Sequence, residues 1–410
     1  MLSPALQSAP PHFDITAPNV FLDPYPLLHK MRRERPVYFC PELGSWILTT
    51  FQDVCATLRD GRFSVVEETK RIEALPPSDQ TALATLRRNF EAWGDRGREE
   101  EHARFLKLLK RYFTPQRVEA QRPRIQAILG DLIARALARG EVDIANDIAH
   151  PLAMTVVAGL TGAPTDQIDM FLRCSAAISG LLEMGTRDQL FACQGGILEI
   201  AECLRPVVAR HRADPADDLF NVFMEADPSG AYYTDDHIIA QGIMFLVVGY
   251  HTTANQLCNG LQLLFEHPEE RAKLARDPSL LPNAFDEMMR YHGAVASIRR
   301  LATVDLTIRG ERIRAGDTVI LALAAANRDP EPFPDPDRFS IEREGASRHV
   351  GFTIGPYSCM GQALARLEGQ IFFRTLLDRF PRLRPMDATP DWMVFRPLGR
   401  ELRTQRVLVD

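Results

Sequence analysis

The spacing of apolar residues divides the chain into a mixed first part, a long helical middle and a third part that begins with strands. From about Thr81 to Arg276, apolar side chains recur every three or four positions, the pattern of helices that bury one face. Shorter elements are predicted ahead of this region: a helix from near Pro24 that ends before Pro36, β-like runs at 37–40 and 46–49, and a helix over 51–59.

Strand character returns between Leu301 and Leu323, where Gly310 and residues 315–317 supply turn chemistry. The proline-dense stretch Asp329–Pro336 cannot be helical. A last helix is predicted from just after Cys359 toward Phe380. Because no repeat, low-complexity tract or Gly/Ser linker interrupts the pattern, we expect a single domain over 1–410, mainly α with a small β portion. Residues 1–22 are expected to form a flexible N-terminal extension.

Charge and cysteine content narrow the class of protein. The formal net charge of −6 argues against a nucleic-acid binder, which normally carries a basic surplus. The seven cysteines are odd in number and none has C-x-x-C spacing, which is typical of a reducing compartment. The apolar run Ile243–Val248 inside the chain is far too short to span a bilayer. We therefore expect a cytoplasmic protein with no membrane partner.

One cysteine stands where a loop meets a predicted helix. Cys359 follows a glycine-bearing loop, and helix N–H groups together with the helix dipole stabilise a thiolate over a thiol. Gly355 and Gly361 allow the backbone to approach a large flat group. The alternative is an ordinary buried cysteine, since unpaired cysteines mostly behave as small hydrophobic residues.

This loop resembles the cysteine-ligand loop of the cytochrome P450 family, in which Phe, two residues, Gly, three residues, Cys, one residue and Gly follow in order. The four fixed positions are matched by Phe352, Gly355, Cys359 and Gly361. The resemblance implies the P450 fold and heme b, with Cys359 as the iron ligand and the other three residues around the cofactor. One position departs, because Tyr357 stands where the family usually has a His or Arg that pairs with a heme propionate.

Further matches suggest which residues support the cofactor. Glu287 and Arg290 form the family's Glu-x-x-Arg pair, which Arg338 in the proline-rich stretch is expected to complete; taken alone, the pair could equally be a weak surface ion pair. The resemblance assigns the propionates to His102, Arg300 and Tyr357, with Arg299 in reserve, since buried carboxylates need donors. The alternative for His102 is a solvated surface histidine.

The run Val248-Gly249-Tyr250-His251-Thr252 interrupts a long apolar helix with residues of low helix propensity. Threonine hydroxyls there can bond the carbonyl four residues earlier and bend the helix, so a kinked core helix is one interpretation. The resemblance instead implies the family's central helix across the heme, with Thr252 as the catalytic alcohol beside dioxygen. His251 replaces the usual acid, and either relays protons or points away to a neighbouring carboxylate.

The resemblance implies a heme-thiolate monooxygenase that uses O₂ and electrons from ferredoxin and ferredoxin reductase, or a similar redox partner. The substrate would be a small organic molecule, such as a secondary-metabolite intermediate. The residues expected in its pocket are Phe90, Trp93, Phe245, Val248, Val295, Ile298 and Val394. The basic residues expected to dock the redox partner, or else to form a solvated face, are Lys107, Lys110, Arg111 and Arg366.

Two other functions stay open. One is a heme-thiolate oxidase that couples rings or radicals without inserting oxygen, for which His251 is the only hint. The other is a non-catalytic heme-binding protein. The presence of Thr252 and of the whole cysteine loop argues against that second alternative.

Overall fold

The computed structural model of the protein describes residues 12–15, 17–65, 69–95, 99–181, 185–396 and 398–409. The α-helices are α1 (Pro18–Leu22), α2 (Tyr25–Glu34), α3 (Phe51–Arg59), α4 (Thr69–Glu73), α5 (Pro77–Ala82), α6 (Ala84–Ala92), α7 (Glu99–Tyr112), α8 (Pro115–Glu119), α9 (Arg122–Arg139), α10 (His150–Thr161), α11 (Ile168–Leu181), α12 (Arg187–Ala213), α13 (Leu219–Ala226), α14 (Asp235–Glu266), α15 (Pro268–Arg276), α16 (Leu281–His292), α17 (Leu323–Asn327) and α18 (Gln362–Arg379). The strands are β1 (Val37–Cys40), β2 (Ser45–Leu48), β3 (Phe63–Val65), β4 (Val142–Asp143), β5 (Ile298–Ala302), β6 (Leu306–Ile308), β7 (Glu311–Ile313), β8 (Thr318–Leu321), β9 (Arg384–Pro385), β10 (Asp391–Arg396), β11 (Gly399–Thr404) and β12 (Arg406–Leu408).

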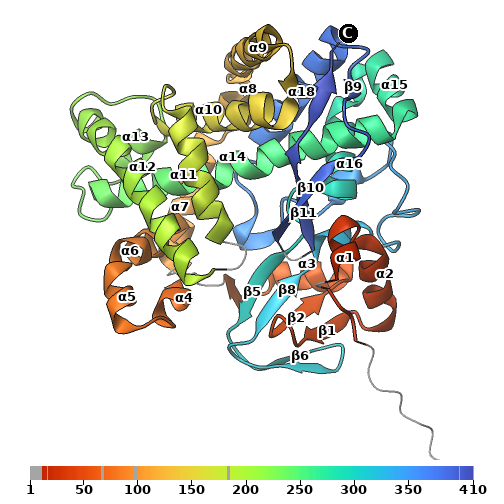
Figure 1. Cartoon of the computed structure of the whole chain (residues 1–410). Helices are drawn as coiled ribbons and strands as arrows, with labels where there is room; N and C mark the ends of the chain where they lie inside the picture. Colours follow the sequence, from red (N-terminus) through yellow and green to blue (C-terminus); the bar gives the residue numbers. More distant parts are fainter. Residues whose placement is uncertain are drawn as a thin grey trace, which may run out of the picture.

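The prediction of a mainly α fold with a small β portion is confirmed. The largest sheet has five strands in the order β1-β2-β8-β5-β3, and it gathers with α1–α3 on one side of the molecule (Figure 1). Strands β2 and β8 pair in parallel, with Ser45 opposite Thr318, whereas the neighbouring pairs are antiparallel. Helices α4–α13 fill the other side, and α14 crosses between the two regions (Figure 1).

The predicted N-terminal extension over 1–22 packs against the rest of the fold in the part of it that the structure describes. Phe13 and Ile15 are buried, and the Phe13 ring packs edge-on against Tyr38 at a centroid distance of 4.9 Å. Residues 18–22 form the short helix α1. Apolar burial therefore attaches this segment to β1.

Helix α14 is the central element of the fold. Thr234 caps its N-terminus by accepting a hydrogen bond from the His237 N–H, and most of its side chains are buried. Gly260 lies where α14 crosses α18, since a Cβ at this position would meet Phe373 Cζ at 2.5 Å. The missing side chain therefore lets the helix that follows Cys359 approach α14 closely.

A buried ion-pair network secures the region ahead of the cysteine loop. Arg290 Nε donates to Glu287 Oε2 at 2.7 Å, and both side chains are completely buried. The third member is Arg343, whose Nε lies 3.1 Å from Glu287 Oε1. The prediction of Arg338 is wrong, because this exposed residue contributes its carbonyl oxygen to Arg290 and no described side-chain contact to Glu287. The surface-pair alternative is excluded by the burial.

Candidate functional site

The cysteine loop is folded back on itself immediately before α18. The Cys359 N–H donates to the Phe352 carbonyl at 2.9 Å, and the Thr353 hydroxyl donates to the Tyr357 carbonyl at 2.9 Å. Gly355 has a φ of +81°, and a Cβ there would lie 2.5 Å from the Leu58 carbonyl oxygen. Glycine is thus required on both conformational and steric grounds, and the loop is pressed against the end of α3.

Cys359 keeps an exposed surface even though protein surrounds much of its sulfur. Desolvation raises the pKa of the Cys359 thiol, while the Gly361 N–H and the positive charge of Arg366 act in the opposite direction. Arg366 is held by Asp286, Nε to Oδ1 at 2.8 Å, and lies over the Phe352 ring. The feature that fits a metal ligand is the exposed position of Cys359 in front of a helix, in contrast to the buried Cys40 and Cys258.

Three residues predicted as propionate partners lie together beside this loop. The His102 ring stacks on Tyr357 at a centroid distance of 4.8 Å, and the Arg300 guanidinium lies 5.4 Å from the centre of the same ring. His102 is buried, which excludes the solvated alternative. Its Nδ1 bonds the Gly94 carbonyl at 2.8 Å, but its buried Nε2 has no hydrogen-bond partner within the protein. A nearby carboxylate would accept a hydrogen bond from Nε2, so this cluster fits heme propionates.

Helix α14 has one narrow open stripe in its middle. Val248 is 42% exposed, and Phe245, Gly249 and Thr252 are half-buried, although the helix is buried on its other sides. The Thr252 hydroxyl donates to the Val248 carbonyl at 3.3 Å, as the sequence predicts for a threonine inside a helix. A small alcohol is therefore presented beside an apolar surface, at a place where a flat ligand could lie.

His251 faces away from this stripe. Its Nε2 lies 3.2 Å from Glu401 Oε2 on β11, and Asn255 Nδ2 donates to the same carboxylate oxygen at 2.5 Å. The second interpretation of His251, a bond to a neighbouring carboxylate, is the one that the structure contains. Sequence reasoning missed Glu401 and Asn255. The only signal was the amide of Asn255, four residues after His251 on the same side of the helix, and no pattern in the sequence pointed to Glu401.

The predicted pocket residues divide into two groups. Phe245 and Val248 line the open stripe, while Val295, ahead of β5, and Ile298, its first residue, are half-buried. Trp93 is buried and donates from Nε1 to Asn89 Oδ1 at 2.7 Å, with Phe90 packed edge-on against it. These two aromatic residues belong to the packed wall around α6. Val394 belongs to β10, and its side chain lies outside the described residues.

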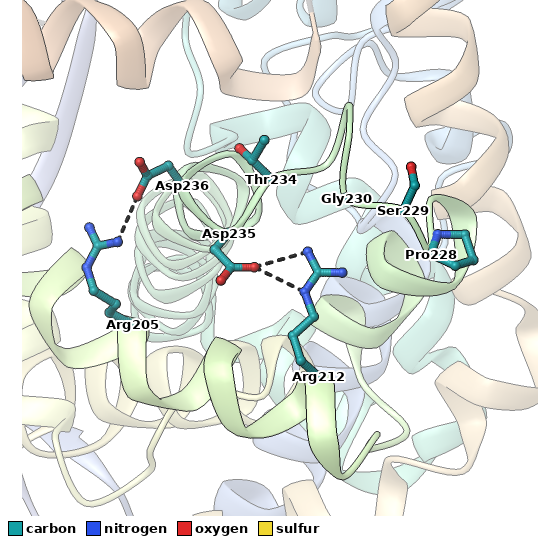
Figure 2. A pocket seen from close by; sticks show the side chains of 8 residues that line it. All are labelled: Arg205, Arg212, Pro228, Ser229, Gly230, Thr234, Asp235 and Asp236. Atoms are coloured by element: carbon teal, nitrogen blue, oxygen red, sulfur yellow. Dashed lines mark hydrogen bonds and ion pairs between the residues drawn. The ribbon is translucent and has the colours of Figure 1, made fainter.

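A wide surface recess lies elsewhere, at the N-terminal end of α14. Figure 2 shows its charged side chains paired with one another, Arg212 with Asp235 and Arg205 with Asp236. Asp235 precedes Thr252 by seventeen residues, roughly 25 Å along the helix axis. The recess is therefore separate from the cysteine loop and the open stripe.

The described residues contain neither a cage for a metal ion nor a helix that could span a membrane. Nowhere in the described ranges do three or more His, Cys, Asp or Glu side chains converge as a metal-ion cage. No described helix has both the length and the apolar character needed to cross a bilayer.

Comparison with known proteins identifies the family. The Cytochrome P450 family profile matches residues 199–402. Cytochrome P450 monooxygenase PikC of Streptomyces venezuelae is 34% identical over 95% of this chain and 92% of its own, and 6-deoxyerythronolide B hydroxylase of Saccharopolyspora erythraea is 32% identical over 90% and 92%. The crystal structure of CalO2 superposes with a TM-score of 0.88 at 30% identity, over 97% of this chain and 99% of that one. The chain therefore belongs to the cytochrome P450 family and is a heme-iron oxidoreductase of the monooxygenase type.

Proposed function

We propose that this protein binds heme b through Cys359 and inserts one oxygen atom from O₂ into a small, largely apolar organic molecule. The observation that carries the proposal is the open stripe of α14, where Val248 is exposed and Thr252 is half-buried in a helix otherwise enclosed by protein. A stripe of this kind supplies an apolar surface for a substrate and one hydroxyl group for an oxygen ligand.

Separate residues hold the cofactor and serve the reaction. Cys359 would ligate the iron, Phe352, Gly355 and Gly361 would contact the porphyrin, and His102, Tyr357 and Arg300 would bind the propionates. Bound heme supplies reductive O₂ activation, which the thiolate favours by electron donation. Thr252 would orient a hydrogen-bonded water or oxygen group on the open side of α14. His251 would influence protons there only through Glu401 or water, because its ring is paired with Glu401.

We further propose the substrate and partner classes. The relative 6-deoxyerythronolide B hydroxylase bears the name of a substrate that it oxidises, and by analogy this chain would act on an intermediate of bacterial secondary metabolism. P450 enzymes take electrons from a redox partner, and a ferredoxin with its reductase in the cytoplasm is the partner we propose. Lys110 and Arg111 are exposed on α7 and offer positive charge to an acidic protein surface.

Turnover under ¹⁸O₂ tests this function. Compounds that convert the ferric heme from low to high spin would be incubated with ferredoxin, its reductase and reduced nicotinamide, and the products analysed by mass spectrometry. We expect one ¹⁸O atom per product molecule, and none with Cys359→Ser. A product formed at the same rate without incorporated ¹⁸O would support ring or radical coupling instead.

A further inference from the structure

The side of α14 that carries His251 continues as a row of buried polar residues toward the C-terminal end of the helix. His251, Asn255 and Asn259 follow at four-residue spacing, so they lie on one side of the helix. Asn255 and Asn259 are almost completely buried. Gln262 and Glu266 extend the row to the surface, where Gln262 Nε2 donates to Glu266 Oε1 at 2.9 Å.

Polar residues of the C-terminal strands face this row. Asn255 Nδ2 donates to Glu401 Oε2 on β11, and Gln405 Nε2 donates to the Cys258 carbonyl of α14 at 3.1 Å. Gln405 precedes β12 and is itself buried. Helix and strand thus enclose a polar seam between them.

Several polar atoms of the seam have no partner in the protein. They are Asn255 Oδ1, Gln405 Oε1 and both amide atoms of Asn259. Buried polar atoms are nearly always bonded to protein or to ordered water, and a polar cluster is the kind of place that holds buried water. Partnerless atoms gathered along one seam therefore indicate a row of waters and not a single defect of packing.

The seam reaches the surface at a second recess. Gln262, Glu266, Thr404 and Gln405 are among the residues that line it. Gln262 follows Thr252 by ten residues, which corresponds to roughly 15 Å along the helix. A few waters are enough to bridge that distance.

We propose that this seam is a hydrated proton path from the recess at the C-terminal end of α14 to the His251–Glu401 pair, whose histidine directly precedes Thr252 in the helix. The proposal rests on the monooxygenase function, in which each O₂ takes up two protons and two electrons, gives one oxygen atom to the substrate and leaves the other as water. Each water of the path passes one proton inward and takes one from its outer neighbour, so the path is restored by protons from bulk solvent. The titratable groups that face its inner end are His251, Glu401, Tyr250 and His150, whose ring lies 6.0 Å from that of His251.

A high-resolution crystal structure of the heme-loaded enzyme tests the water row without any turnover. We expect ordered waters bonded to Asn259, to Asn255 Oδ1 and to Gln405 Oε1. A dry seam in which these amides bond only protein groups would overturn the proposal. This readout does not depend on the reaction that the enzyme catalyses.

The solvent isotope effect on O₂ consumption tests proton transport. The enzyme would be supplied with electrons by a plant-type ferredoxin and its reductase, in H₂O and in D₂O. We expect Asn259→Leu and Gln405→Leu, two independent blocks of the seam, each to raise the isotope effect at least two-fold. Leu261→Ala, a buried position on α14 outside the polar row, should leave it unchanged. An isotope effect equal to that of the parent in both folded, heme-loaded leucine variants would refute the path. If the parent consumes O₂ but oxygenates no substrate, the monooxygenase proposal fails while this comparison still judges the path.

Discussion

His251 Nε2 and Glu401 Oε2 lie 3.2 Å apart, and only about a tenth of each side chain is exposed (11% for each). The family usually places an acid at the helix position of His251. In this protein the helix carries the base and β11 carries the acid. The carboxylate is therefore still present, but it reaches the central helix from the C-terminal hairpin, the antiparallel pair β10–β11.

Exchanging the residues of the His251–Glu401 pair should separate the effect of their charges from the effect of their shapes. His251→Glu places two carboxylates side by side, so we expect it to lower the free energy of unfolding by about 1–3 kcal/mol and to divert reducing equivalents to hydrogen peroxide. The double variant His251→Glu with Glu401→His should recover most of both losses. Denaturant unfolding measures the loss of stability, and the product formed per reduced nicotinamide consumed measures the diversion of reducing equivalents. If the effects of His251→Glu and of Glu401→His, each measured alone, simply add up in the double variant, the two groups are not coupled.

Replacement of the proposed iron ligand should change the cofactor's spectrum. Cys359→His is expected to retain heme, since imidazole also binds iron, and to lose the thiolate-type spectrum of the ferrous carbon monoxide complex. Absorption spectroscopy of the reduced protein is sufficient. A thiolate-type spectrum in the variant would mean that another cysteine ligates the metal.

The buried ion-pair network offers a matched comparison of two arginines. Arg343→Ala should destabilise the protein by about 3–5 kcal/mol, because it strands part of the charge on buried Glu287. Arg338→Ala should change stability by less than about 0.5 kcal/mol, since its side chain is exposed and its contact to Arg290 comes from the backbone. Equal losses of unfolding free energy in the two variants, measured by chemical denaturation, would show that the Arg338 side chain belongs to the network.

Glu368 on α18 should make stability fall as pH rises. Burial raises the pKa of this carboxyl from 4.5 to about 8, and its Oε2 has no partner in the protein. Between pH 4.5 and 8 the folded state keeps the proton that the unfolded chain releases, so the free energy of unfolding decreases across this window, by at most about 5 kcal/mol. Glu368→Gln should flatten that slope in thermal unfolding measured from pH 5 to 8. A slope identical to that of the parent would argue against a protonated Glu368.

Heme retention should depend on His102. His102→Phe keeps the stack on Tyr357 but removes the buried Nε2, so we expect heme transfer to apomyoglobin to become several-fold faster. Tyr357→Phe, which keeps the ring and removes one hydroxyl, should have a smaller effect. Similar transfer rates for the parent and His102→Phe would exclude a role in propionate binding.

Local patterns were sufficient for much of the fold. The helix over 51–59 has the bounds that the sequence predicts, and the structure shows that Thr50 caps it by accepting a hydrogen bond from the Asp53 N–H. The helix after Cys359 was predicted within a few residues for a similar reason, since glycine precedes it and proline follows it. Periodicity and capping chemistry operate over a few residues and can be read directly.

The errors arose where distant segments meet. Nothing near Arg343 in the sequence distinguishes it from Arg338, and only the course of the proline-rich coil brings Arg343 to Glu287. The burial of Phe13 depends on Tyr38, and the partner of His251 lies on the C-terminal hairpin. The family resemblance supplied His102, Arg300 and Tyr357 as a group, which no local pattern would have connected.

A small tilt of α14 at its close crossing with α18, at Gly260, would move the middle of the helix by a larger distance. Eight residues separate this contact from Thr252, about 12 Å of stiff helix. A tilt of roughly five degrees at the crossing would move Thr252 by about 1 Å, a misplacement that can lower an enzymatic rate about a hundred-fold. A methyl group at residue 260 should therefore disturb catalysis more than stability, and a smaller side chain at residue 373 should compensate for it.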